Sequence, residues 1–287
     1  MSKKGMATRA VHDGDRSLRY EGAINTPIFQ SSTFSFPTDD PRTWEGEVPR
    51  GTYIYSRNSN PTVEAVEEKL ASLEGAEASL AFSSGMAAIS TALLAFVGKG
   101  DRVVAMQDLY GGTYGLLRNE MPRLGVDVAF VPTTDPEELC AAIDGRTKVL
   151  YLESPTNPLL KLIDIKETCR LAHEKGCRVL IDNTFATPVL QRPLEQGVDV
   201  VLQAGVPWRP RRQAAGPRGE VPPGQQWIYL VAQDGIDCGL FDTLAQRLDA
   251  PRGPADGGAR GYLQGEALQQ WLQLLQAALA ATRATAG

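Results

Sequence analysis

The sequence predicts an α/β protein in which helices cover both faces of a mainly parallel β-sheet. Between residues 78 and 202, short runs rich in β-branched residues alternate with helical patterns, which is typical of βαβ units. The strand-like runs are largely apolar, as expected for strands buried on both faces. Hydrophobic residues make up 43% and charged residues 22% of the 287-residue chain, which is ordinary for a globular protein.

The expected elements follow one another at regular spacing. Residues 1–55 contain few periodic runs and should form an N-terminal arm with short turns. A helix is expected over 62–73, with an apolar face made of Val63, Val66, Leu70 and Leu73. Beyond it we expect strands at 79–82, 101–107, 126–132, 147–154, 177–184 and 198–202, with helices at 85–97, 112–125, 135–143 and 164–176.

Composition argues against several classes of function. A net charge of −5 disfavours nucleic acid as a partner, because binding a phosphate backbone needs concentrated positive charge. No apolar run approaches the length of a membrane span, and the first residues lack the apolar core of a signal peptide. The four cysteines, Cys140, Cys169, Cys177 and Cys238, lie far apart without paired spacing. We therefore expect reduced thiols in a cytoplasmic protein that binds neither membrane nor nucleic acid.

The composition changes near residue 203. No lysine follows Lys175, and the segment 203–287 is rich in arginine, proline and glycine, which favours loops over packed structure. We therefore expect an arm over 1–55, a large domain over 56–202 and a divergent tail over 203–287. Within the tail, 263–281 has a helical pattern that we interpret as a chance helix in Gln/Ala/Leu-rich sequence.

Two motifs would suit a phosphorylated ring at the carboxyl ends of the strands, where parallel sheets bind ligands. In FSSGMAAI, a turn of small residues precedes a helix whose free N–H groups favour phosphate, and Gly85 permits close approach. The alternative is an ordinary serine-capped helix start. In QDLYGGTY, Tyr110 could stack on a planar heterocycle. The alternative there is a tyrosine packed over a glycine turn.

Two further motifs place polar groups at strand ends. YLESPTNPLLK carries Glu153 and Asn157, and the Asn amide could bond a ring oxygen, although plain turn chemistry explains the motif equally well. In VLIDNTFATP, a buried strand ends at Asp182, an acid whose burial is costly without a partner. A protonated pyridine nitrogen would be such a partner. Capping of the next element is the alternative.

A fifth motif precedes the large domain. In YSRNSNPT, Tyr55 and Arg57 could hold phosphate oxygens, the arginine through a forked bond, or could lie in an exposed loop. Five motifs follow one another along the chain: YSRNSNPT, SSGMAAI, DLYGGTY, ESPTNP and IDNTFATP. The same motifs occur in the same order in one known family of enzymes. From about Ala7 to Leu202 the sequence resembles the Cys/Met-metabolism family of pyridoxal-phosphate enzymes. This family includes cystathionine γ-synthase, cystathionine γ-lyase, methionine γ-lyase and O-acetylhomoserine sulfhydrylase.

The resemblance implies a fold, a cofactor and residue roles. The fold would be the pyridoxal-phosphate transferase fold type I, with an arm, a large domain and a small C-terminal domain, usually assembled as a dimer of dimers. The cofactor would be pyridoxal 5′-phosphate, and the substrates small sulfur amino acids. Gly85 and Met86 would give N–H groups to the phosphate, and Tyr110 would stack on the ring and move protons. Asn157 would lie near the ring hydroxyl, and Asp182 would pair with the ring nitrogen. Tyr55 and Arg57 would reach the phosphate in the neighbouring subunit.

The resemblance breaks at the residue on which the family's chemistry depends. After a strand such as 198–202 the family continues with His-Ser-Ala-Thr-Lys-Tyr, whose lysine forms the Schiff base, since only a primary amine makes an exchangeable imine. The aligned positions here read Gln203, Ala204, Gly205, Val206 and Pro207. Arginine cannot substitute, because its guanidinium stays protonated.

A shift of reading frame would explain the break. Residues 206–212 can be back-translated so that dropping the first base encodes Tyr-Leu-Gly-Gly-His-Gly-Asp, which is how the family continues after its lysine. The family's small domain, with its substrate-carboxylate arginine, would then be missing or non-native.

Two interpretations of function follow. The chain is a trans-sulfuration enzyme by descent, catalysing γ-elimination or γ-replacement on cystathionine or O-acyl-homoserine, but inactive as written because the lysine is absent. Alternatively, it is a catalytically dead pseudoenzyme or truncated subunit that binds an intact family member and lends it Tyr55 and Arg57. Gly112 stands where methionine γ-lyases tend to carry cysteine, which disfavours that activity. Lys148 and Lys161 are the candidates for an alternative cofactor lysine, and neither lies where the family geometry requires one.

Overall fold

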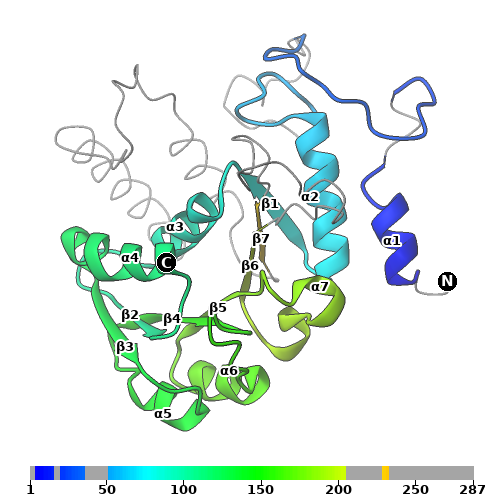
Figure 1. Cartoon of the computed structure of the whole chain (residues 1–287). Coiled ribbons are helices and arrows are strands. Elements are labelled where there is room, and N and C mark those ends of the chain that lie inside the picture. The colour runs from blue at the N-terminus through cyan, green and yellow to red at the C-terminus, as the bar shows by residue number, and fades with distance from the viewer. Residues whose placement is uncertain (1–3, 16–19, 36–50, 205–227, 233–287) are drawn as a thin grey trace, which may run out of the picture.

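The chain is described by a computed structural model that covers residues 4–15, 20–35, 51–204 and 228–232. Within these residues it folds around a seven-stranded sheet (Figure 1). The strands, in chain order, are β1 Ala78–Phe82, β2 Arg102–Met106, β3 Asp127–Val131, β4 Thr147–Glu153, β5 Arg178–Asp182, β6 Val200–Ala204 and β7 Ile228–Ala232.

The sheet is mainly parallel. Its strand order is β1-β7-β6-β5-β4-β2-β3. The five strands from β6 to β3 in this order are parallel neighbours, whereas β7 is antiparallel to both β6 and β1. It follows that β1 runs in the same direction as the parallel strands. The expected α/β class and its mainly parallel sheet are confirmed.

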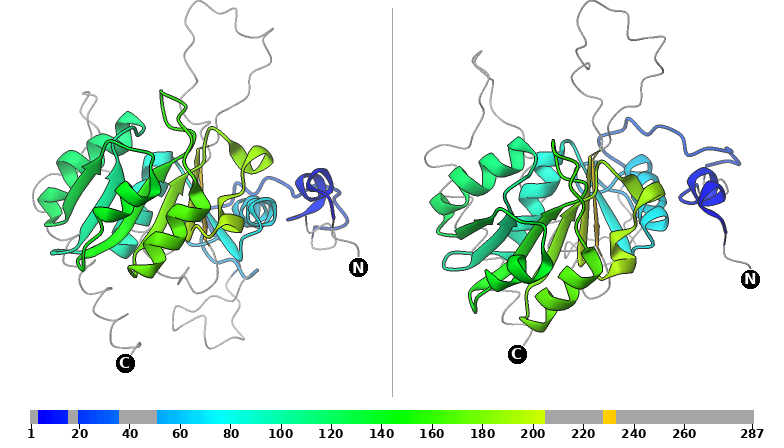
Figure 2. Two further views of the ribbon diagram at one scale, coloured as in Figure 1. Left: turned by 90° about the horizontal axis from the view of Figure 1, so that it is seen from below. Right: turned by 60° about the horizontal axis from the view of Figure 1, so that its bottom comes forward.

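Helices cover the two faces of the sheet, as Figure 2 shows. Helix α3 packs across β1, β4, β6 and β7 on one face, with α4 beside it. Helix α6 packs on β5 against the opposite face, next to α5. The helices are α1 Met6–His12, α2 Pro61–Glu74, α3 Gly85–Phe96, α4 Gly111–Gly115, α5 Pro136–Ala141, α6 Ile165–Glu174 and α7 Thr187–Leu190, and π-helical or 3₁₀ turns follow at Leu116–Glu120, Pro122–Leu124 and Pro193–Gln196.

The core lies between the sheet and these helices. The central strands are apolar along nearly their whole length, because both of their faces are covered. Cys140, Cys169 and Cys177 are buried and unpaired, while Cys238 and the helical pattern at 263–281 lie outside the described residues.

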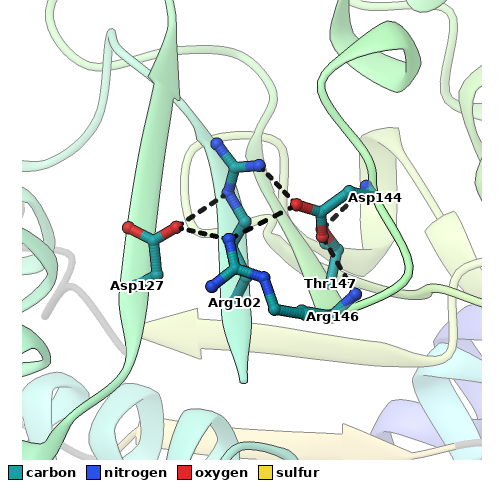
Figure 3. Close-up of polar contacts among 5 residues, drawn as sticks. All are labelled: Arg102, Asp127, Asp144, Arg146 and Thr147. Carbon is teal, nitrogen blue, oxygen red and sulfur yellow. Dashed lines mark hydrogen bonds and ion pairs between the residues drawn. The ribbon is translucent and has the colours of Figure 1, made fainter. Parts of the chain in front are cut away.

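The amino ends of the strands are joined by a cluster of charged side chains (Figure 3). The Arg102 guanidinium lies 2.8 Å from Asp144 and 3.3 Å from Asp127, the first residue of β3. Arg146 reaches the same two acids at 3.6 and 3.3 Å, and the Thr147 hydroxyl bonds to Asp144. This cluster ties together the starts of β2, β3 and β4, at the edge opposite the sequence motifs.

Helix α2 buries a different face from the one its periodicity predicts. The predicted apolar stripe, which includes Val63 and Leu70, is only half-buried, whereas Glu64 and Glu74 are buried. The reason is polar pairing: the Glu74 carboxylate accepts a hydrogen bond from the side chain of Gln203 on β6. A pattern of apolar residues alone cannot predict a buried acid that finds its partner on a distant strand.

Strand β7 is an element that sequence analysis did not predict. It lies in the segment 203–287, where composition favours loops, but Ile228–Ala232 is a short run rich in residues that favour strands. It pairs with both β1 and β6 and so closes the gap between them. Helix α1 in the arm was likewise not predicted. No helix in the described part of the chain is long and apolar enough to cross a membrane.

Candidate functional site

The four cofactor motifs of the large domain end at one edge of the sheet. Strands β1, β2, β4 and β5 run in the same direction, so their carboxyl ends meet at that edge. The segment SSG after β1, DLYGG after β2, SPTNP after β4 and NTFAT after β5 therefore lie together. Ligands of such sheets bind in this position, outside the carboxyl ends of the strands.

The first turn of α3 offers free amide groups at this edge. Ser84 caps the helix: its side-chain oxygen accepts from the Ala87 N–H at 3.2 Å, and its carbonyl accepts from the Ala88 N–H at 3.1 Å. The N–H groups of Gly85 and Met86 have no acceptor within the helix, because they occupy its first positions. The serine cap is therefore present, and binding of an anion by the two remaining donors stays a prediction.

Tyr110 lies beside the start of α3. The Tyr110 side chain is 47% exposed, and Gly112 brings its ring close to the Met86 sulfur. A Cβ atom on Gly112 would lie 2.6 Å from Tyr110 Cε1 and 2.8 Å from Met86 Sδ, closer than such atoms approach. The absence of a side chain at Gly112 therefore leaves room for both the half-exposed Tyr110 ring and the Met86 side chain.

Asp182 is the buried acid of the site. It is 8% exposed, and its Oδ1 atom accepts a hydrogen bond from the Thr184 N–H at 2.9 Å. Burial raises the pKa of this carboxyl, and hydrogen bonds from Thr184 only partly oppose that rise. Among the described residues no lysine, arginine or histidine forms an ion pair with Asp182. A buried carboxyl without a cation fits a protonated ring nitrogen brought by a ligand.

Glu153 is a second buried acid at the same edge, and sequence analysis gave it no role. It is paired in register with Asp182 on the neighbouring strand. Its Oε2 atom accepts from the backbone N–H of Tyr110 at 2.7 Å. Burial raises the pKa of Glu153 to about 7, and the negative charge of Asp182 adds to this rise. The backbone groups of Tyr110 and Asn157 act in the opposite direction and lower the pKa. The available signal was its position, the last residue of an apolar strand, which it shares with Asp182.

Within the part of the chain that the structure describes, no hydrogen bond or ion pair links the side chains of Tyr55 and Arg57 to this edge. Both side chains are exposed, and the Arg57 guanidinium lies 5.1 Å from the centre of the Tyr55 ring. Tyr55 forms an isolated β-bridge with Thr33 in the arm. Asn157, by contrast, does lie at the edge, half-buried in the loop after β4.

The two alternative lysines lie at opposite edges of the sheet. Lys148 is exposed near the start of β4, far along the strand from the motifs. Lys161 lies at the motif edge, and its Nζ atom forms an ion pair with Asp108 at 2.6 Å. At the family's lysine segment the structure describes Gln203 and Ala204 at the end of β6, and Gly205 to Pro207 lie outside the described residues. Gln203 is bonded to Glu74, and the Ala204 N–H to the Thr184 hydroxyl.

Anion donors, an exposed aromatic face and an unpaired acid at one sheet edge define a class: proteins that bind a flat, phosphorylated heterocycle with a protonatable nitrogen. Comparison with known proteins places the chain within that class. The profile of the family described as Cys/Met metabolism PLP-dependent enzyme matches residues 7–208. The chain belongs to this family, whose cofactor is pyridoxal 5′-phosphate.

Curated relatives match the same part of the chain. It is 46% identical over 207 residues to L-methionine gamma-lyase from Porphyromonas gingivalis, covering 71% of this chain and 51% of that protein. It is 42% identical over 204 residues to cystathionine gamma-lyase from Bacillus subtilis, again 71% and 51%. The chain thus spans about half the length of the curated relatives it matches.

Solved structures share the fold. The crystal structure of MetB from Corynebacterium glutamicum aligns with a TM-score of 0.73 at 34% identity, covering 86% of this chain and 60% of that one. Methionine gamma-lyases, cystathionine lyases and a cystathionine gamma-synthase all match at 41–46% identity, so similarity does not select one activity.

Proposed function

We propose that this chain binds pyridoxal phosphate reversibly at the motif edge of its sheet and lacks the catalytic turnover of its family. The Gly85 and Met86 N–H groups hold the phosphate, and the Tyr110 ring lies against the pyridine face. Asn157 lies near the ring hydroxyl, and ionised Asp182 holds the proton on the ring nitrogen. When bound, the cofactor supplies an electron-withdrawing ring for reactions at amino-acid carbons.

The proposed lack of catalytic turnover rests on one observation: no lysine follows Lys175 in the sequence. The family's covalent bond to the cofactor needs a primary amine just after β6, and residues 203–207 read Gln-Ala-Gly-Val-Pro. Lys161 is the lysine nearest to the motifs along the chain, but its ammonium is paired with Asp108. The chain therefore offers ring and phosphate contacts without the amine that exchanges the cofactor onto a substrate.

We propose that the substrate class inherited from the family is small sulfur amino acids of the cystathionine or O-acyl-homoserine type. Relatives named as methionine or cystathionine lyases and as cystathionine synthase support this class. We further propose that residues 203–287 arose by a shift of reading frame and replace the family's small domain. Sequencing the coding DNA tests this: a shifted frame that encodes a family segment beyond Leu202 supports it, and its lack overturns it.

A second candidate function is favoured by the position of Tyr55 and Arg57. Both are exposed, and among the described residues neither side chain is hydrogen-bonded or ion-paired to the motif edge of its own chain. We propose that they serve a neighbouring subunit's phosphate, so that this chain could complete the site of an intact family member. Co-expression with a relative that lacks its own equivalents of Tyr55 and Arg57 tests this: restored turnover supports it.

The binding proposal is tested by titrating the purified chain with pyridoxal phosphate and following intrinsic fluorescence. We expect saturable binding that dialysis reverses, and at least about tenfold weaker binding by Asp182→Asn, a loss of about 1.4 kcal/mol. Asp144→Asn, the same substitution at the opposite edge, should leave affinity unchanged. Equal affinity of the Asp182 variant and the wild type, or no saturable binding at all, would contradict the proposal.

A further inference from the structure

Glu153 links two of the loops that form the site. It is the last residue of β4, it is 5% exposed, and its carboxylate accepts the Tyr110 N–H at 2.7 Å. The backbone of Asn157, in the loop that follows Glu153, also lowers the pKa of this carboxyl. Tyr110 belongs to the loop after β2, and Asn157 to the loop after β4. One buried side chain at the end of β4 therefore holds the backbone of Tyr110, the residue whose ring we propose lies against the cofactor.

Burial of Glu153 at this position costs free energy, so a compensating interaction is expected. It lies beside Asp182 in register on the next strand, and two neighbouring buried acids repel each other when both are ionised. An apolar residue would remove that cost and continue the apolar run of β4. The gain that offsets the cost is structural: the Tyr110 backbone N–H would otherwise lose its acceptor.

A second contact joins the same two loops nearer the surface. Lys161 Nζ lies 2.6 Å from Asp108, two residues before Tyr110. The loop after β4 is closed on itself, because Thr156 exchanges backbone hydrogen bonds with Lys161 and Leu160. The loop carrying Asn157 is thus internally fixed, and Glu153 fixes the Tyr110 backbone relative to it.

We propose that Glu153 is a positioning residue of the cofactor site, which fixes the backbone of Tyr110 relative to the loop that carries Asn157. The inference rests on the proposed binding of pyridoxal phosphate. Glu153 acts through the Tyr110 backbone N–H and leaves the phosphate donors of α3 untouched. Ring recognition and phosphate recognition should therefore separate when Glu153 is changed.

The experiment compares Glu153→Ala and Glu153→Gln with the wild-type full chain. Dissociation constants are measured for pyridoxal phosphate and, by competition, for inorganic phosphate. Glu153→Ala should bind pyridoxal phosphate about tenfold more weakly, because the Tyr110 backbone N–H loses its acceptor. Phosphate affinity should stay within about twofold, because the substitution leaves the Gly85 and Met86 N–H groups of α3 in place. Glu153→Gln keeps one carbonyl acceptor and should fall between the wild type and the alanine variant.

The matched control is Asp144→Ala, which removes a carboxylate that ties loops at the opposite edge (Figure 3). It should lower the unfolding midpoint without changing either affinity. In a Tyr110→Ala background, Glu153→Ala should cost little further pyridoxal phosphate affinity, because the residue it positions is already gone.

The outcomes separate the two proposals. If the wild type binds no pyridoxal phosphate, the proposed function fails and this inference fails with it. If the wild type binds and both Glu153 variants bind equally well, only the positioning role is overturned. Parallel loss of phosphate and pyridoxal phosphate affinity would also overturn it, since that pattern indicates general damage to the fold. Should Glu153→Ala fail to fold, the same comparison is made with Glu153→Gln.

Discussion

Three buried carboxyl groups show how much single residues depend on tertiary packing. Glu74, Glu153 and Asp182 are each less than a tenth exposed, and burial raises the pKa of all three. Asp182 and Glu153 face the motif edge, where a ligand and backbone donors can use their charge. Glu74 lies elsewhere, between α2 and β6, and its partners are Gln203 and, more distantly, Arg192.

Glu74 should make the stability of the protein depend on pH. Burial raises its pKa to about 7 from an ordinary value of 4.5, so the folded state binds the proton more tightly than the unfolded state. The stabilisation is complete below pH 4.5 and is lost as the pH rises through 7. Glu74→Gln should therefore reduce the loss of unfolding free energy between pH 5 and pH 8 by roughly 1–3 kcal/mol.

Urea unfolding at the two pH values measures this. Glu167→Gln is the control, because Glu167 lies on the surface of α6 and Arg170 lowers its pKa, away from the tested range. An unchanged pH dependence in Glu74→Gln would show that the Glu74 carboxyl is not the group that titrates.

At the site, sequence reasoning found residues but not their connections. Gly85, Met86, Tyr110, Asn157 and Asp182 were predicted from motifs at strand ends, and the shared direction of β1, β2, β4 and β5 places them at one edge. The hydrogen bond from the Tyr110 N–H to Glu153 joins residues 43 positions apart in the chain. No local pattern encodes such a pair. The same holds for the packing of Met86 against Tyr110 across Gly112.

At the scale of elements, strands with continuous apolar runs were the most predictable. Strands β2, β3, β4 and β5 fall within the expected ranges, because continuous apolar runs bounded by turns permit few alternatives. Strand β6 extends to Ala204, beyond the predicted end at 202. Strand β7 was missed because its strand pattern is short and its place in the sheet depends on pairing with β1 and β6, not on its own neighbours in sequence.

The contribution of β7 can be measured by truncation. A chain ending at Ala204 lacks the strand that pairs with β1 and β6, so the facing edges of both would be unpaired. We expect this chain to have a lower unfolding midpoint and to aggregate more than a control ending at Ala232. Thermal unfolding by circular dichroism, with light scattering, measures both. Equal midpoints would show that residues 205–232 add nothing to the stability of the sheet.

At the scale of the whole molecule, the motif edge carries exposed apolar side chains. Leu159, Leu160 and Leu162 follow β4, and Val189 and Leu190 end α7, with Leu190 81% exposed. Large apolar groups exposed along one edge are typical of surfaces that contact another chain. A second copy at this edge would also provide the Tyr55 and Arg57 that the chain does not bring to its own site.

Cofactor affinity should therefore depend on protein concentration. If Arg57 of one subunit binds the phosphate in its neighbour, affinity rises as subunits associate. Arg57→Ala should weaken pyridoxal phosphate binding by about tenfold in the associated state and leave the dissociated chain unchanged. Titrations at several protein concentrations, with sedimentation, measure this. Arg118→Ala is the control, since Arg118 also lies over a tyrosine ring, at 5.8 Å from the centre of Tyr114.

We propose that the chain holds its cofactor without a covalent bond. Its most direct test is borohydride reduction of the chain saturated with pyridoxal phosphate, followed by peptide mass spectrometry. We predict that dialysis after reduction removes nearly all the cofactor, and that the trace retained is spread over several surface lysines. Stoichiometric labelling of one lysine, abolished by substituting that residue in Lys161→Ala or Lys148→Ala, would contradict the account.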